Sequence, residues 1–324
     1  MNFKLLFLFK KLLTLIASIV VVFFVVYYII LAAGGKSLSI KQRGGKIVMV
    51  SSSERFFKKE SVISGYFSYL KQIITMDLGE SYYFGLPVKD IVLDRLKNTV
   101  ILNFFALFLL FVIGISLGIF SAFFKNLTVR FLEIFFFVLY AVPDFILAIF
   151  LIIVFSLTLG WFPSSGMVSL GHEQMSTLGK ILDYFNHIFL IALSLTLSSI
   201  IFLARFTDSS ITQIMNDFYM LSLKVRGVDT FSNKLKHIMK NAIFPFISLL
   251  TFIIPSLVSG AIIIETIFGY PGIGQVFFKA VSERDYPLIL AVSFINVSVI
   301  FFSIFITDIL YLIFDPRVSN EELG

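Results

Sequence analysis

Long apolar runs separated by polar loops dominate the pattern of this chain. A helix needs about 20 mostly apolar residues to cross the hydrocarbon core of a bilayer, which is about 30 Å thick. Six segments come close to or exceed that length without a lysine or an arginine: Leu12–Ala33, Thr99–Phe124, Phe131–Leu159, His187–Leu203, Ala242–Phe268 and Leu288–Phe314. The pattern therefore predicts an all-α membrane protein with six transmembrane helices.

The composition supports the same class. The 324 residues are 58% hydrophobic and 14% charged, with a mean hydropathy of +0.97. Soluble chains carry about 25% charged residues, and disordered chains are poor in apolar ones. The chain has no cysteine, which excludes disulfides, thiolate metal sites and cysteine nucleophiles.

The first apolar run follows three lysines and ends in Ala32-Ala33-Gly34, which resembles a signal-peptide cleavage site. Its apolar stretch is longer than the roughly 7 to 15 residues of a signal peptide. We interpret it as an uncleaved first helix, with cleavage as the alternative.

The positions of lysine and arginine predict the orientation, because short basic loops resist translocation. With the N-terminus in the cytoplasm, the inner segments 1–11, 125–130, 204–241 and 315–324 hold 12 of these residues, and the outer loops 160–186 and 269–287 hold 3. The other 11 lie in the loop 34–98, which is long enough for the rule to lose force. Both termini are therefore expected in the cytoplasm. The net charge of +6 reflects this placement of basic residues in the loops. It does not indicate nucleic-acid binding, because the basic residues form no continuous face.

Two loops have amphipathic patterns. At the end of the loop 34–98, Val88–Leu96 has apolar residues at helical spacing and one charged face, which predicts either an interfacial anchoring helix or a docking surface. The inner loop 204–241 is basic, which membrane contact would explain. Alternatively, Gly227 separates two short helices, Asp217–Arg226 and Phe231–Lys240, that a cytoplasmic protein grips to move the spans.

Polar residues inside spans are expensive and need an explanation. Asp144 directly follows Pro143 within the third span, and we expect it either to line a polar pathway or to pair inside the bundle. Glu265 lies near the outer end of the fifth span, where a hydrogen bond between helices or at a gate is favoured over substrate contact. Glycines inside the spans permit close helix approach, namely Gly114, Gly118 and Gly260.

Two sequence motifs typical of enzymes are partly present in this chain, but each lacks a required residue. Gly35-Lys36-Ser37 imitates the end of a phosphate-binding loop, but Ile30 stands where the first glycine is required. His172-Glu173 begins like a zinc-protease motif, but Ser176 replaces the second histidine. The three histidines are widely spaced in the sequence, so no metal site is expected. Any energy for transport must come from a partner or from an ion gradient.

Two sets of ordered motifs resemble the inner-membrane permease subunit of bacterial ABC importers, specifically the B-type subunit of the dipeptide, oligopeptide and nickel family. The first set lies in the loop 204–241 and the span entry after it, from Tyr219 through Gly227 to Pro245. The second set contains GAIIIETIFGYPGIG at 260–274, Arg284-Asp285-Tyr286-Pro287, Asp308 and Asp315-Pro316-Arg317. Further matches are Asp77-Leu78-Gly79-Glu80-Ser81, Pro87-Val88, Asn98-Thr99, Pro143 and Leu159-Gly160-Trp161-Phe162-Pro163, so the resemblance covers about residues 77–317.

The resemblance implies a type I ABC importer fold, a second homologous permease subunit, two cytoplasmic ATPases that bind ATP and Mg, and an extracytoplasmic substrate-binding protein. This chain itself would bind no cofactor or metal and catalyse nothing. The residues implied to couple to the ATPases are Tyr219, Ser222, Leu223, Lys224, Arg226, Gly227, His237, Asn241 and Pro245. Departures from the family pattern are Phe218, Leu223 and Val225 in that loop, Asp144 in place of a small residue, and residues 34–70.

These expectations divide the chain into an N-terminal helix (1–33), an extracytoplasmic loop (34–98), a five-helix permease core (99–317) and a cytoplasmic tail (318–324). The substrate is expected to be a peptide, with nickel or another small solute as the alternative, because the spans hold no cluster of histidine, methionine or carboxylate. A secondary transporter driven through Asp144 is a rival class, but most spans hold at most one carboxylate. A membrane-embedded enzyme lacks a paired nucleophile and base.

Overall fold

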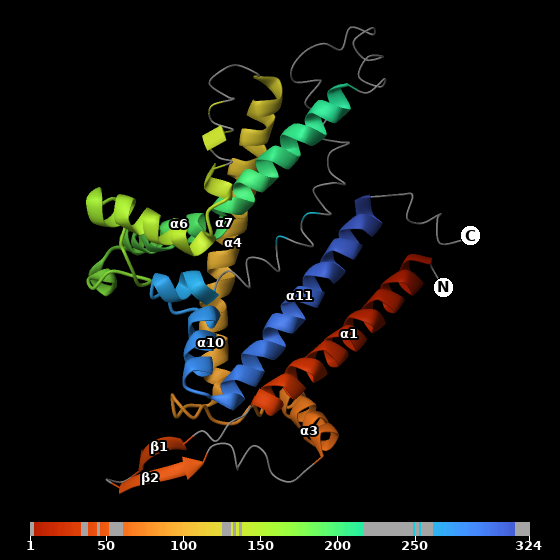
Figure 1. The fold of residues 1–324 in the computed structure, drawn as a ribbon, viewed down its shortest axis with the longest axis vertical. Coiled ribbons are helices and arrows are strands. Elements are labelled where there is room, and N and C mark those ends of the chain that lie inside the picture. The colour runs from red at the N-terminus through yellow and green to blue at the C-terminus, as the bar shows by residue number, and fades with distance from the viewer. Residues whose placement is uncertain are drawn as a thin grey trace. The chain divides into compact units, whose positions relative to one another are not determined.

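The computed structural model describes residues 3–33, 38–43, 46–51, 61–124, 131, 134–135, 138–216, 249, 253 and 262–314 (Figure 1). Helices make up most of this part, which confirms the predicted helical fold class. Its two strands, β1 (Leu38–Arg43) and β2 (Lys46–Ser51), pair antiparallel with Leu38 opposite Ser51. The sequence pattern did not predict this hairpin, which lies in the loop 34–98.

Four helices in the described part are long and apolar enough to cross a membrane. They are Leu6–Ala33 within α1 (Phe3–Ala33), α4 (Val88–Phe123), α7 (Thr177–Met215) and Tyr286–Leu310 within α11 (Tyr286–Phe314). They coincide with the predicted first, second, fourth and sixth spans. The predicted fifth span, 242–268, lies mostly outside the described residues and stays a prediction.

Three of these helices extend well beyond the predicted spans, and the first is α1, which begins at Phe3 and not at Leu12. The segment Val88–Leu96 is the first part of α4, so this amphipathic segment and the second span form one continuous helix. Its two faces are as expected, since Val88 and Val92 are buried while Lys89 and Asp94 are exposed. α7 extends well beyond 187–203 at both ends. Hydropathy marks only the part of a helix that suits hydrocarbon, whereas polar residues at both ends continue the same helix.

The predicted third span, 131–159, is not one regular helix. A turn at 141–142 and Pro143 precede α6 (Asp144–Leu151), and a π-helix, η1 (Ile152–Thr158), follows it. Proline has no amide hydrogen to donate to the preceding turn, so the helix restarts after Pro143. The wider π-helical turns close with bonds such as Leu159 N to Val154 O, at 3.0 Å.

The chain divides into two compact units, unit 1 (Met1–Val100 with Pro271–Phe305) and unit 2 (Ile101–Tyr270 with Ile306–Gly324). In unit 1, Phe23 of α1 is fully buried and meets Phe294 of α11 edge to face, with ring centroids 5.1 Å apart. α1 and α11 accordingly lie side by side (Figure 1). The helix α3 (Val62–Ile74) packs against α1, where the Tyr66 hydroxyl donates to the Val20 carbonyl at 2.5 Å.

In unit 2, glycines of α4 allow α7 to approach closely. A Cβ atom on Gly118 would lie 2.4 Å from the Thr207 Cβ and 2.6 Å from the Ala204 carbonyl oxygen, and one on Gly114 would lie 2.9 Å from a Leu203 methyl. The predicted close approach is thus confirmed at Gly114 and Gly118. Gly260 lies outside the described residues.

Candidate functional site

The predicted ATPase-coupling residues lie outside the described part of the chain. They all fall within 217–248, namely Tyr219, Ser222, Leu223, Lys224, Arg226, Gly227, His237, Asn241 and Pro245. Their role stays a prediction. What the structure shows is the helix that leads into them: α7 ends at Met215, and the amide of its C-cap, Asn216, donates back to the Thr212 carbonyl.

Asp144 begins α6 and is bonded to α7. The Ser198 hydroxyl donates to Asp144 Oδ1 at 2.5 Å, and the carboxylate lies in the first turn of α6, where the helix dipole stabilises negative charge. Asp144 and Pro143 are nevertheless exposed on the surface of the chain. The carboxylate pairs with a second helix and also remains accessible, so both predicted roles of Asp144 stay open.

Glu265 lies fully buried within unit 2, on the helical turn formed by residues 262–267. This turn ends at Gly269, whose positive φ of 59° lets the Tyr270 amide donate to the Glu265 carbonyl at 2.9 Å. The Tyr270 hydroxyl is 3.0 Å from the hydroxyl of Tyr184 on α7. Burial raises the pKa of Tyr270 well above its ordinary value, so this pair is a neutral link between the two segments.

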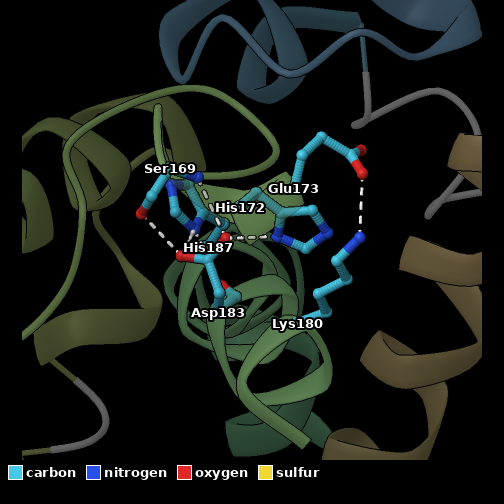
Figure 2. Close-up of polar contacts among 6 residues, drawn as sticks. All are labelled: Ser169, His172, Glu173, Lys180, Asp183 and His187. Carbon is cyan, nitrogen blue, oxygen red and sulfur yellow. Dashed lines mark hydrogen bonds and ion pairs between the residues drawn. The ribbon is translucent and has the colours of Figure 1, made fainter. Parts of the chain in front are cut away.

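A buried carboxylate on α7, that of Asp183, bonds to the loop that precedes this helix (Figure 2). Asp183 accepts hydrogen bonds from the amide and the hydroxyl of Ser169, at 3.0 and 2.5 Å, and its other partner is His172 Nδ1 at 2.7 Å. His187 Nδ1 lies 3.5 Å from the same carboxylate and donates to the Asp183 carbonyl at 2.8 Å. Asp183 thereby fixes loop 160–176 on the start of α7.

Two further contacts hold loop 160–176. The Gly166 amide donates to the Phe268 carbonyl at 2.9 Å, which ties the loop to the segment that contains Glu265. On the surface, Lys180 Nζ lies 2.8 Å from Glu173, and this hydrogen bond lowers the pKa of the Glu173 carboxyl. Because the ion pair is exposed, water and salt weaken it, and the buried contacts determine the position of the loop.

In unit 1, Asp285 is the corresponding buried carboxylate. It is fully buried and accepts from the Ser81 hydroxyl at 2.5 Å, from the Tyr83 amide at 3.1 Å and from the Leu288 amide at 3.4 Å. The last bond makes Asp285 the N-cap of α11, and Pro287 lies in the first turn, which it suits. Asp285 therefore joins the turn after residue 80 to the start of a membrane-spanning helix.

Neighbouring motif residues join α4 to the helix α10 (Ile273–Ser282) within the same unit. The Asn98 side-chain amide donates to the Pro271 carbonyl at 2.8 Å, and the Thr99 hydroxyl accepts from the Ile273 amide at 2.8 Å. Segments 173 to 204 residues apart in the sequence thus meet through Ser81, Asn98 and Thr99 on one side and residues 271–285 on the other. Several of the separate motifs that carry the family resemblance are thus joined by hydrogen bonds within unit 1.

These arrangements position backbone segments. In the part of the chain that the structure describes, no group of three histidine or carboxylate side chains is arranged to hold a metal ion. The sequence spacing of the histidines does not predict the bonds around Asp183, because His172 lies in a loop whose fold brings it to α7. The signal was present, since Asp183 and His187 are four residues apart and therefore share one face of a helix.

Comparisons with known proteins identify a family and relatives of this chain. Residues 114–320 match the protein family described as "Binding-protein-dependent transport system inner membrane component". The chain is 32% identical over 256 residues to the oligopeptide transport system permease protein AppB of Bacillus subtilis, which covers 78% of this chain and 79% of the relative. It is 28% identical over 290 residues, 88% of each chain, to the dipeptide transport system permease protein DppB of the same organism.

Proposed function

Because this chain belongs to the family of binding-protein-dependent transport system inner membrane components, which has the type I ABC importer membrane fold, we propose that it is one permease subunit of an ATP-driven peptide importer. Its role as a multi-pass membrane permease follows from the family and from the apolar helices. The observation that supports a peptide substrate is the similarity, over most of the chain, to relatives named as oligopeptide and dipeptide permeases.

In this proposal the subunit pairs with a second, homologous permease to enclose the pathway in the bacterial inner membrane, with both termini in the cytoplasm. Two cytoplasmic ATPases bind ATP and Mg and hydrolyse the nucleotide, while an extracytoplasmic binding protein delivers the substrate. The part of the loop 204–241 that follows the end of α7 at Met215 docks into the ATPases, with Gly227 at the bend between its two short helices. When the ATPases close, they pull this loop, and α7 transmits the movement because it runs directly into the loop.

The proposal is tested by replacing Gly227 with aspartate in the reconstituted complex. The added bulk and charge at the bend are expected to lower peptide-stimulated ATP hydrolysis and peptide uptake at least tenfold, while the subunit still inserts and assembles. The matched control is Gly171→Asp, because a side chain there meets open space. Normal coupled hydrolysis by the Gly227 variant would contradict the proposal, and uptake of nickel in place of peptides by the unmodified complex would change its substrate.

The exposed carboxylate of Asp144 is expected to face the pathway, because a charge facing lipid is unfavourable. Asp144→Asn keeps an acceptor for the Ser198 hydroxyl and removes the charge. We expect it to lower the uptake of lysine-containing peptides about threefold to tenfold relative to neutral peptides, the range of one partly screened charge contact. Ser198→Ala, which removes the hydrogen bond and keeps the charge, should leave this ratio unchanged. If Asp144→Asn and Ser198→Ala show the same ratio of lysine-containing to neutral peptide uptake, Asp144 lies outside the pathway.

A further inference from the structure

An apolar cavity of about 480 Å³ lies within unit 1, between the last turns of α1 and the helices α10 and α11. Its wall is mostly hydrocarbon, with Ile29, Ile30 and Ala33 from α1, Phe277 and Val281 from α10, and Ile289 from α11. Arg284, in the turn between α10 and α11, is the charged residue of its lining. A water-filled space with such walls is unfavourable, so the cavity suits an apolar occupant.

The cavity lies where two membrane-spanning helices end. The span of α1 ends at Ala33 and that of α11 begins at Tyr286, so both helix ends lie at the boundary between hydrocarbon and headgroups. The described protein covers α1 thinly, since 11% of its most apolar window is buried. At this boundary, Ile29 and Ile30 lie at the level expected for acyl chains and Arg284 at the level expected for phosphate groups.

Arg284 occupies a backbone position that favours glycine. Its φ is +54°, and the Asp285 amide donates to the Ala280 carbonyl at 2.8 Å while its own amide donates to the Val281 carbonyl at 3.2 Å. These two bonds form the helix ending in which the left-handed residue is usually glycine, as Gly269 is at the corresponding position in unit 2. An arginine in this conformation is less stable than glycine would be, which raises the hypothesis that its side chain has a function.

The other members of the Arg284-Asp285-Tyr286-Pro287 motif have a structural role, and Arg284 has none in the described chain. Asp285 caps α11, Tyr286 is buried in the core, and Pro287 fits the first turn of the helix. Within the described residues Arg284 makes no ion pair, and its side chain is exposed at the cavity. Its guanidinium, which binds phosphate oxygens in a bidentate manner, is available to a ligand outside the chain.

We propose that this cavity binds a glycerophospholipid of the bilayer, with one acyl chain among the walls of α1, α10 and α11 and the phosphate at Arg284. The lipid fills the gap between α1 and the α10–α11 pair, and so holds the first helix against its unit. The proposal does not depend on the identity of the transported substrate.

The first test uses Arg284→Gly, because glycine adopts the required backbone conformation and the variant is expected to fold. Native mass spectrometry of the purified full-length chain, with added dioleoylphosphatidylglycerol, should show one retained lipid per wild-type chain. Occupancy by this lipid should fall about tenfold in the variant, the loss expected for one charge-assisted hydrogen bond. Lys279→Gln removes an exposed charge of α10 that does not line the cavity, and it should bind lipid as the wild type does.

The second test fills the space. Ala33→Phe places a ring in the cavity and should reduce retained lipid, whereas Val25→Phe, at an exposed position of α1 outside the cavity, should not. Lipid retention at wild-type level in both Arg284→Gly and Ala33→Phe overturns the proposal. It is equally overturned if a photo-crosslinker at Ala33 captures a protein segment, from this chain or from a second permease, in place of lipid.

Discussion

Replacing Asp285 with alanine is expected to lower the free energy of unfolding by about 3 to 7 kcal/mol. The carboxylate is fully buried and accepts from three donors, the Ser81 hydroxyl and the amides of Tyr83 and Leu288. Alanine removes an N-cap, which stabilises a helix by about 1 kcal/mol, and leaves the other two donors without their acceptor, at about 1 to 3 kcal/mol each. The quantity to measure is the unfolding equilibrium of the detergent-solubilised chain.

Three further variants distinguish the loss of these hydrogen bonds from a general effect of removing a charge. Asp285→Asn keeps one acceptor oxygen and should retain part of the stability. Ser81→Ala removes one hydrogen bond from the same cluster, so its effect should not add to that of Asp285→Ala. Asp94→Ala removes a carboxylate whose side chain is 72% exposed and should change stability by less than about 0.5 kcal/mol. Equal effects of Asp285→Ala and Asp94→Ala would contradict the assigned role.

The apolar pattern predicted the spans well because bilayer thickness imposes one length on every crossing helix. It located α1, α4, α7 and α11, and it also indicated the glycines at which α4 and α7 meet. It could not predict that α7 continues as one helix from Thr177 to Met215, because the residues beyond the hydrocarbon are polar. Only an N-cap defines where this helix begins. That cap is Ser176, whose hydroxyl accepts from the Gly179 amide.

The polar clusters were harder to predict than the spans. Asp183 and Asp285 bond to residues whose partnership depends on how loops fold back, and no periodicity records such a pairing. For Asp285 the partner Ser81 is 204 positions away, so only the folded chain brings them together. The resemblance to a family had marked Ser81, Asn98, Thr99 and Asp285 as motif residues without a physical reason, and the hydrogen bonds among their segments supply that reason.

Replacing Gly118 with alanine is expected to destabilise unit 2 by up to about 2 kcal/mol, despite alanine's higher helix propensity. In isolation the substitution would stabilise α4 by about 1 kcal/mol. The new Cβ, however, would lie 2.4 Å from the Thr207 Cβ and 2.6 Å from the Ala204 carbonyl oxygen. Because a backbone oxygen cannot rotate away, α4 and α7 must separate, and such overpacking costs about 1 to 3 kcal/mol or more.

The same substitution at two other glycines tests this steric explanation. At Gly114 the nearest atoms belong to the Leu203 side chain, which can change rotamer, so Gly114→Ala should cost less than Gly118→Ala. At Gly171 no atom lies within 4 Å, and alanine should be neutral or slightly stabilising. Thermal unfolding of the three purified variants should therefore rank them with Gly118→Ala least stable and Gly171→Ala most stable. If Gly118→Ala unfolds at the same temperature as Gly171→Ala, the close contact of α4 with α7 does not contribute to stability. Since α7 leads directly into the segment proposed to meet the ATPases, a variant that separates α4 from α7 should also weaken the coupling of ATP hydrolysis to peptide uptake.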